Sequence, residues 1–175
     1  MIANKTLLCL KLSLHKQYVK IKLLYKIGVT TMSETIFYKI AKGEIPTNVV
    51  YEDDVVMAFL DTSQVTKGHT LLIPKEPIKD IFDYDAEYAG QVLSRLPKVA
   101  NALKQAFPDM TGLNILNNNG ESAYQSVFHS HFHLIPRYDK DNDGFGLKWE
   151  THEDDYSDND MQELADHIRQ YTKEV

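Results

Sequence analysis

The chain has 175 residues, 43% hydrophobic and 25% charged, a composition that excludes wholesale disorder. A membrane-spanning helix and a disulfide framework are excluded as well, because there is no run of 18 uncharged apolar residues and the only cysteine is Cys9. Six of the 19 basic residues precede residue 32, so the remaining chain holds 13 basic and all 25 acidic residues. This acidic body argues against nonspecific nucleic-acid binding. We expect one domain in the cytoplasm, with neither a nucleic-acid nor a membrane partner.

Residues 1–31 differ in character from the rest of the chain. They mix leucine, isoleucine and valine with six lysines and contain no acid. The longest apolar stretch, Leu7–Leu10, is too short for the hydrophobic region of a signal peptide. An organised pattern starts directly after Thr31, so we interpret residues 1–31 as an upstream extension outside the fold, with Met32 as the natural start. A basic amphipathic helix on a membrane surface is the alternative.

The first half of the body predicts a short helix and three strands. Ser33 is a suitable N-cap, and Gly43 ends the helix. Val49–Tyr51 and Val55–Leu60 are typical of strands joined by an acidic turn, and His69–Ile73 predicts a third strand.

The second half begins with a long helical pattern. Apolar residues recur at helical spacing between residues 89 and 107, and include Leu93 and Ala106. Pro97 lies inside this pattern and predicts a kink or two abutting helices. A fourth strand is expected around Leu113 and Ile115, before the turn residues 117–120.

The fifth strand is predicted over Val127–Ile135, stopping at Pro136. The acidic segment 141–175 comes next, with a possible terminal helix over residues 159–173. Its apolar residues are expected to point inward: Met161, Leu164, Ala165 and Ile168. The fold class is therefore α+β, with an antiparallel five-stranded sheet covered on one face, a long kinked helix and short helices, in a domain over residues 32–140.

Three histidines on the predicted fifth strand are the most informative feature. His129, His131 and His133 occupy positions i, i+2 and i+4 and would project from one face of a strand. Phe128, Phe132 and Leu134 would project from the other face into a core. Three neighbouring imidazoles are poor core filling, so we favour a functional role over a structural one.

Two chemistries fit these histidines. Two of them could ligate a metal ion with a third ligand from elsewhere, but the body of the chain has no cysteine. Alternatively, a neutral imidazole with a pKa near ~6.5 is a nucleophile at neutral pH. A covalent phosphohistidine would split one difficult displacement at phosphorus into two easier ones.

The segment His129–Ile135 resembles the histidine triad (HIT) signature, in which three histidines alternate with apolar residues. The resemblance extends to further segments in the same order, over about residues 34–137. These are residues 35–40, 44–46, 51–54, 58–61, 68–70 and 73–75. The resemblance implies a HIT fold, a homodimer and a nucleotide substrate.

The resemblance also implies a role for each matching residue. His131 matches the nucleophile, and His129 matches the histidine that orients the nucleophile through a relay. His133 matches the histidine that contacts phosphate and helps the leaving group depart. His69 matches a fourth histidine near these three. Asp61 matches the carboxylate that holds the ribose hydroxyls. Other positions match residues lining ribose, phosphate and base: Asn118, Tyr124, Gln125, Ser126, Val127, Ile36, Phe37, Ile40 and Phe59.

The activity implied is hydrolysis or transfer at the α-phosphate of a purine nucleotide derivative, through a nucleotidyl-histidine, as in nucleoside phosphoramidate hydrolases. A dinucleoside polyphosphate hydrolase and a nucleotide-binding interaction module with vestigial catalysis remain alternatives.

The sequence departs from the family pattern at two places. Ser130 stands where the signature has an apolar residue, and Thr35 and Tyr38 stand where some bacterial members carry a zinc-binding Cys-x-x-Cys. No zinc and no cofactor are expected, with Mg²⁺ only as a counter-ion of the substrate. The segment around Phe145 and Trp149 is interpreted either as part of a dimer interface or as a solvated tail.

Overall fold

The computed structural model of the chain describes residues 35–139, 146, 151 and 155–172. The chain divides into two compact units, residues 1–144 and 145–175, which are described separately. The interpretations of residues 1–31, Phe145 and Trp149 concern positions outside the described residues.

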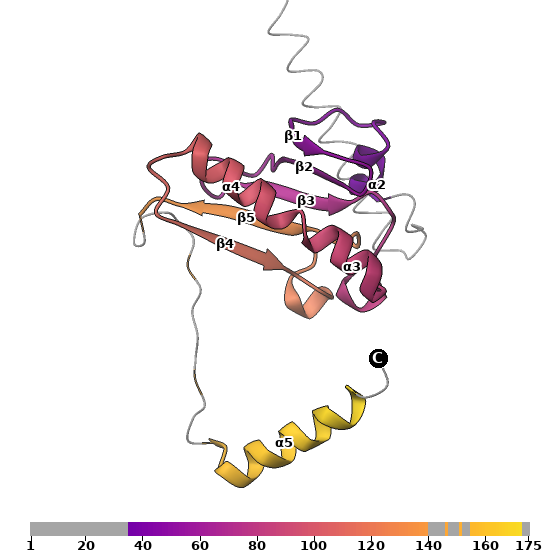
Figure 1. Cartoon of the computed structure of the whole chain (residues 1–175), viewed down its shortest axis with the longest axis vertical. Coiled ribbons are helices and arrows are strands. Elements are labelled where there is room, and N and C mark those ends of the chain that lie inside the picture. Colours follow the sequence, from indigo (N-terminus) through magenta and orange to yellow (C-terminus); the bar gives the residue numbers. More distant parts are fainter. Residues whose placement is uncertain (1–34, 140–145, 147–150, 152–154, 173–175) are drawn as a thin grey trace, which may run out of the picture. The chain divides into compact units, whose positions relative to one another are not determined.

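Five antiparallel strands form one sheet in the order β1-β2-β3-β5-β4, which confirms the predicted sheet (Figure 1). β5 lies between β3 and β4, so the histidine segment enters the sheet beside the strand that follows His69. The strands are β1 Val49–Glu52, β2 Val56–Leu60, β3 Thr70–Pro74, β4 Gly112–Asn117 and β5 Phe132–Arg137.

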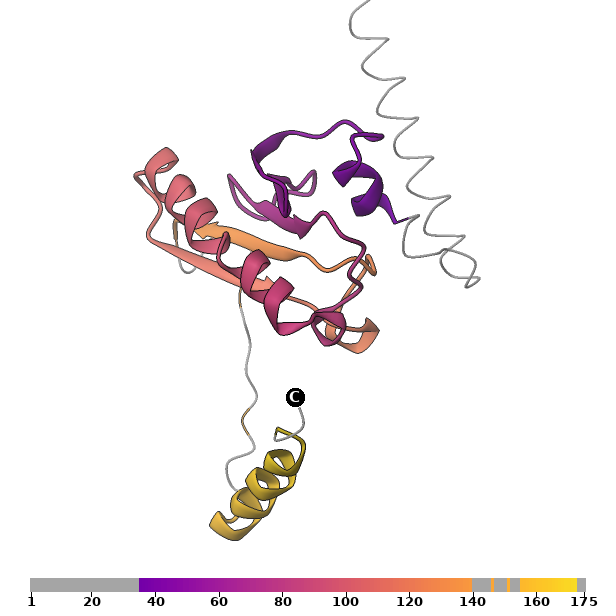
Figure 2. The same ribbon diagram turned by 45° about the vertical axis from the view of Figure 1, so that its right-hand side comes forward.

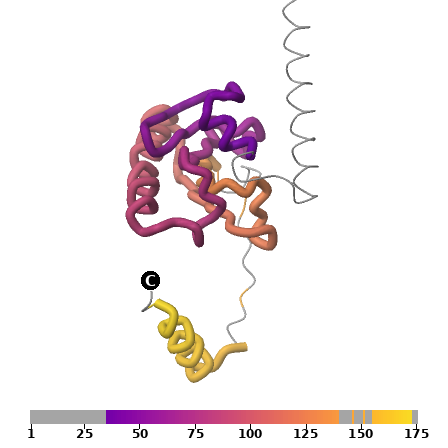
Figure 3. The backbone as a smooth tube through the Cα atoms, turned by 90° about the vertical axis from the view of Figure 1, so that its right-hand side faces the viewer, coloured from indigo at the N-terminus to yellow at the C-terminus, as the bar shows by residue number. Residues whose placement is uncertain are grey.

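Both faces of the sheet are covered, so the expectation of a single covered face is wrong. Val56 and Ala58 of β2 are buried in the cluster that contains residues of helices α3 (Ala86–Leu93) and α4 (Leu96–Ala106). Their alternating neighbours Met57 and Phe59 pack with helix α2 (Ile36–Ala41). Figures 1 and 3 show α3 and α4 on one side of the sheet and α2 on the other. This double burial explains why four of the five β2 residues are buried.

The long helical pattern forms two abutting helices, α3 and α4, one after the other along one face of the sheet (Figure 2). Ser94 closes α3, and Pro97 lies in the first turn of α4, where a missing N–H costs no helical hydrogen bond. The apolar stripe is buried at Val92, Val99 and Leu103. Leu93 and Ala106 are exposed, so their predicted place in the core is wrong.

The N-cap of α2 is Thr35. The predicted N-cap, Ser33, lies outside the described residues. The Thr35 hydroxyl accepts a hydrogen bond from the Tyr38 amide, at 3.1 Å. Gly43 follows the helix at a φ of +74°, a conformation that favours glycine, and its amide bonds back to the Ile40 carbonyl.

β5 begins at Phe132 and includes Pro136, so both predicted ends of this strand are wrong. β3 pairs with β5 only from Phe132 to Leu134, so Pro136 has a partner on one side only, Leu113 of β4. A proline has no N–H to donate to a neighbouring strand and is tolerated at such a position. Residues 127–129 form a bend instead of a strand, and Ser130 and His131 have no regular secondary structure.

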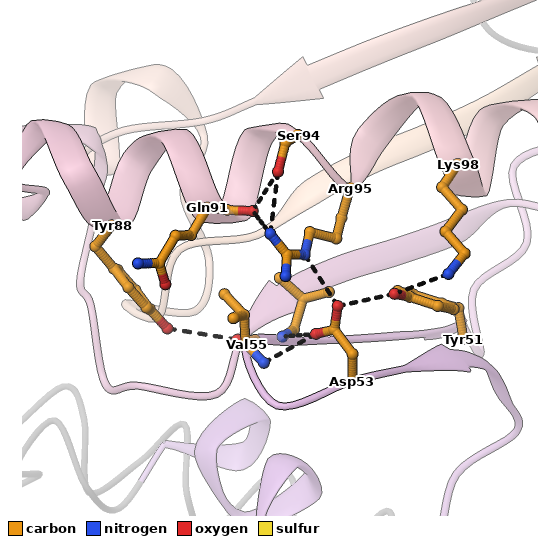
Figure 4. A network of polar contacts seen from close by, with 9 residues as sticks. Tyr51, Asp53, Val55, Tyr88, Gln91, Ser94, Arg95 and Lys98 are labelled. Atoms are coloured by element: carbon orange, nitrogen blue, oxygen red, sulfur yellow. Dashed lines mark hydrogen bonds and ion pairs between the residues drawn. The ribbon is translucent and has the colours of Figure 1, made fainter.

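A polar network fastens the β1–β2 turn to the junction between α3 and α4 (Figure 4). Asp53 accepts hydrogen bonds from the amides of Val55 and Val56, each at 2.9 Å. It also accepts from the Arg95 guanidinium at 2.9 Å and from the Tyr51 hydroxyl at 2.8 Å. These bonds hold the pKa of the Asp53 carboxyl well below its ordinary value, against the opposing effect of burial.

The second unit contains helix α5, Asp158–Tyr171, which begins with a capping box at Ser157. The predicted terminal helix is thus present, and within this unit, described by itself, the side chains of Met161, Leu164, Ala165 and Ile168 are exposed. None of the helices among the described residues has the length and apolar character needed to cross a membrane.

Candidate active site

Only one of the three histidines lies on a strand. His133 is in β5, opposite Leu71 of β3, so it shares the sheet face that α2 covers. Phe132 and Leu134 point into the cluster on the other face, as predicted. His129 lies in the bend before β5 and His131 has no regular secondary structure, so the strand alternation predicted for them is wrong. The rings of His131 and His133 still lie together, edge to face, with centroids 5.0 Å apart.

The His131 ring is held in a single tautomer by the backbone. Its Nδ1 lies 2.7 Å from the His129 carbonyl oxygen. A carbonyl can only accept, so Nδ1 carries the proton and donates it, and Nε2 keeps its lone pair. The ring is nearly inaccessible to solvent and packs edge-on against Phe37, at 5.0 Å between centroids. Burial lowers the pKa of His131, so the imidazole is largely neutral at pH 7.

His129 has both ring nitrogens engaged. Its Nε2 donates to the Pro74 carbonyl at 2.9 Å. Nδ1 must then accept, and it lies 3.4 Å from the Thr35 hydroxyl. Burial lowers the pKa of His129 to about 4, which keeps this fully buried ring neutral. His129 therefore contacts His131 through its carbonyl, and its ring anchors the bend to β3 and to the start of α2.

His133 belongs to a chain of polar groups that leads away from His131. Its Nδ1 lies 3.0 Å from Nε2 of the buried His69, and Nδ1 of His69 lies 3.8 Å from the Asp61 carboxylate. Burial, together with the nearby rings of His131 and His69, lowers the pKa of His133 to about 4. Burial also lowers the pKa of His69, although Asp61 acts in the opposite direction.

Asp61, His69 and His133 are also the described residues best placed to hold a metal ion, since each brings one ligand atom within 4.8 Å of the others. However, the two facing histidine nitrogens are at hydrogen-bond distance, so a shared proton already accounts for their geometry. The Cys-x-x-Cys positions of other members do not fit zinc here. Thr35 and Tyr38 supply hydroxyl groups, and structural zinc sites use thiolate, imidazole or carboxylate ligands.

The predicted phosphate loop is built around Gln125. Its buried side chain accepts from the Gly120 amide at 2.8 Å and donates to the Lys79 carbonyl at 2.7 Å, so it holds the loop. Tyr124 has a φ of +63° and is exposed. Ser126 is exposed beside the half-buried Val127.

The remaining predicted residues fall into two groups. Asn118 is half-buried just beyond the end of β4. Ile40 and Phe59 are nearly inaccessible core residues. Ile36 and Phe37 are only partly buried, so they keep surface that a flat base could cover.

Several residues that shape the site are absent from the set that the sequence predicts. The Asn117 side chain donates to the His131 carbonyl at 2.9 Å. Ser130 is fully buried and accepts from the Tyr84 hydroxyl at 3.1 Å, so its departure from the signature creates a satisfied polar pair. Gln64 bonds to the backbone of Asp61 and His69. The sequence signal for Asn117 is the asparagine run at 117–119, whose pattern is typical of a turn, and the signal for Ser130 is its polar side chain at an apolar position of the signature.

The sheet order and the clustered histidines define a histidine triad domain, and comparisons with known proteins agree. The model of the HIT domain family matches residues 42–140, more than half of the chain, so the chain belongs to the HIT family.

Named relatives share this domain. Protein hit of Bacillus subtilis is 54% identical over 133 residues, which cover 76% of this chain and 90% of that protein. A crystal structure of a HIT family protein from Bacillus anthracis has 51% identity and a TM-score of 0.76, covering 81% of this chain and 99% of that one. The adenosine 5′-monophosphoramidase of Candida albicans is 36% identical over 124 residues, 69% of this chain and 81% of that protein.

Proposed function

We propose that the protein is a hydrolase or transferase that attacks the α-phosphorus of a purine nucleotide derivative, with a nucleoside phosphoramidate as the substrate type. The observation that carries this proposal is the hydrogen bond from His131 Nδ1 to the His129 carbonyl, which leaves a neutral imidazole with its Nε2 lone pair available. Among the described residues, the Nε2 atoms of His131 and His133 have no hydrogen-bond partner.

In the first step, His131 Nε2 attacks phosphorus and forms a P–N bond. The bond from phosphorus to the leaving group breaks, and its electron pair departs with that group. His133 is the neighbouring ring with an unengaged Nε2, so it is suited to give a proton to the departing amine. The imidazolium that forms on His131 is stabilised by its hydrogen bond to the His129 carbonyl.

In the second step, water attacks the phosphorus of the nucleotidyl-histidine. The P–N bond breaks, its electron pair returns to His131 Nε2, and the proton that water loses passes to His133. Acid–base catalysis of this kind contributes ~10²–10⁴-fold. The products are the nucleoside monophosphate and the free enzyme. Both steps use the same two ring nitrogens, and after the second step each of them is back in its starting state.

We assign substrate binding to the residues around this pair of rings. Asp61 is half-buried and can accept from both ribose hydroxyls. Ser126 and backbone amides of its loop, which Gln125 holds in place, are suited to the phosphate oxygens. Ile36 and Phe37 are suited to one face of the base. The named activity of the Candida albicans relative supports a phosphoramidate over a dinucleoside polyphosphate.

The test is single-turnover reaction with an adenosine 5′-phosphoramidate labelled in the adenosine. The wild type should release AMP and transiently carry the label in an acid-labile, base-stable bond. His131→Asn should lower turnover by at least ~10³-fold and carry no label, while still binding AMP. His167→Asn, a change on the second unit's α5, is the matched control and should behave as the wild type. Normal turnover by His131→Asn contradicts the proposal.

The protein should act as a homodimer. Among the described residues β4 lies at an edge of the sheet, and Ile115 on it is 45% exposed, so we expect a second copy to pair with this edge. Sedimentation equilibrium should give the mass of two chains, and the mass of one chain at micromolar concentration contradicts the expectation.

A further inference from the structure

Ser130 is a buried polar residue in the middle of the histidine segment, and the proposed mechanism does not use it. It is fully buried and stands where the signature has an apolar residue. Its hydroxyl accepts from the Tyr84 hydroxyl at 3.1 Å. Burial raises the pKa of Tyr84 to about 12, so this hydroxyl keeps its proton at neutral pH and remains a donor. An apolar side chain would fill the same space without a partner, so core filling does not account for the pair.

The backbone of Ser130 is connected to the nucleophile through one planar peptide group. The His129 carbonyl and the Ser130 amide belong to the same plane. The carbonyl accepts from His131 Nδ1 at 2.7 Å, and the amide donates to the Ile78 carbonyl at 2.7 Å. A rotation of this plane would disturb both hydrogen bonds at once. The orientation of the plane therefore decides whether the His129 carbonyl can hold the Nδ1 proton of His131.

One short segment, residues 78–84, holds Ser130 at two points. The Ile78 carbonyl binds its amide, and the Tyr84 hydroxyl binds its side chain. The capped 3₁₀-helix η2 (Ile81–Asp83) lies between these two anchors and fixes the spacing between them. The segment thus constrains both the peptide plane and the side chain of Ser130.

Tyr84 and the His131 ring pack on opposite sides of this segment. Tyr84 packs against the buried cluster that includes residues of α3 and α4, and its ring stacks on Tyr88 with centroids 6.0 Å apart. The His131 ring packs against Phe37 of α2. Tyr84 therefore acts on the ring from behind, through the backbone of Ser130.

We propose that the hydrogen bond between Tyr84 and Ser130 positions the nucleophile, because it fixes the peptide whose carbonyl holds His131 in the tautomer with a free Nε2 lone pair. Tyr84 and Ser130 are positioning residues, since they act through the backbone. The inference rests on the proposed function for the chemical role of His131. The tautomer of the ring, in contrast, is a property of the protein without substrate.

The first experiment measures single turnovers of an adenosine 5′-phosphoramidate by Tyr84→Phe and Ser130→Ala, each of which removes the hydrogen bond. At saturating substrate the rate constant should fall by about 10-fold in each variant, because a small displacement of a reacting atom is costly. The half-saturating concentration should change by less than about 2-fold, since neither residue is assigned to substrate binding. The double variant should be no slower than the slower single variant, because both changes remove the same contact.

Tyr88→Phe is the matched control. It makes the same change in the ring that stacks on Tyr84, and the hydroxyl it removes donates to the Val55 carbonyl at 3.4 Å. Its rate should equal that of the wild type. A purely structural role of the pair predicts folded variants that are less stable but equally fast. Wild-type rates in both single variants overturn the inference, and so do losses that multiply in the double variant.

The second experiment needs no substrate. Nitrogen NMR of the His131 ring distinguishes a nitrogen that carries a proton from one that carries a lone pair. The wild type should carry the proton on Nδ1, and so should Tyr88→Phe. Tyr84→Phe and Ser130→Ala should each show a mixture of the two tautomers, and each tests the inference if the other fails to fold.

Unchanged His131 spectra in the folded variants overturn the inference. A wild type that does not cleave the phosphoramidate refutes the proposed function instead, and the spectra then still decide whether Tyr84 and Ser130 position the ring.

Discussion

The Thr35 hydroxyl supports the fold and the site at the same time, so its removal provides a sharp test of the structure. It accepts from the Tyr38 amide at the start of α2 and lies 3.4 Å from His129 Nδ1. Thr35→Val keeps the shape of the side chain and removes only the hydroxyl. The Tyr38 amide and His129 Nδ1 then both lose the hydroxyl as a hydrogen-bond partner.

Two costs add. Loss of a side-chain N-cap typically costs ~1 kcal/mol. An unsatisfied buried acceptor costs ~1–3 kcal/mol, and the long 3.4 Å contact places His129 near the lower end of that range. We therefore expect the free energy of unfolding to fall by about 2–3 kcal/mol. This is a large share of the ~5–15 kcal/mol that stabilises a typical domain.

Urea unfolding followed by circular dichroism measures this loss. With a slope of ~1–3 kcal/mol per molar urea, the midpoint should fall by about 0.7–3 M. Thr35→Ser keeps the hydroxyl and loses only a methyl group, so it should lie between the wild type and Thr35→Val, near ~1 kcal/mol. A Thr35→Val variant that is as stable as the wild type, or more stable than Thr35→Ser, refutes the assigned contacts.

The ionisable groups of the domain and the two positions where other members carry zinc ligands lead to three further predictions. Burial holds the pKa of His129 at about 4, so an unfolded chain takes up this proton first, near pH ~6.5, and stability falls between pH ~6.5 and ~4. Urea titrations across this window should show the wild type losing about 3 kcal/mol more than His129→Gln, and parallel profiles contradict the assignment. Asp53→Asn should cost about 1–2 kcal/mol at pH 7, because the partly exposed carboxylate loses charge-assisted hydrogen bonds. The carboxyl pKa is lowered by folding, so this difference should shrink as the pH falls below ~4, whereas Asp54→Asn, at an exposed neighbour, should have little effect at any pH. Elemental analysis of the purified protein should find no stoichiometric zinc, because Thr35 and Tyr38 offer hydroxyl groups in place of thiolates.

The sheet could be predicted from the sequence because its strands obey simple local patterns. β2 and β3 are short runs of apolar residues bounded by turn residues, and the predicted and observed bounds differ by one residue. The number of covered faces could not be predicted in the same way. Continuous apolar runs are compatible with burial on both faces, but α2 is only six residues long and gives little indication of where it packs.

The histidine segment shows where local pattern fails. Strand alternation holds for Phe132, His133 and Leu134, and it places them correctly on opposite faces. It does not hold for His129 and His131, because the chain bends before β5. The sequence still identifies these histidines as members of one site, because the spacing of the motif can be read without knowledge of the backbone. The rings of His129 and His131 donate hydrogen bonds to backbone carbonyls, and no side-chain pattern encodes those bonds.

The differing surroundings of the three rings explain how identical side chains can serve different purposes. His129 uses both nitrogens within the fold, so it cannot contact a substrate directly. His131 uses Nδ1 and His133 uses Nδ1, and each keeps Nε2 for chemistry. What differs between these two is the partner of Nδ1, which is the His129 carbonyl oxygen for His131 and a ring nitrogen of His69 for His133. A carbonyl oxygen can only accept, so it fixes the tautomer of His131, and the role of nucleophile that we propose for this ring rests on that difference.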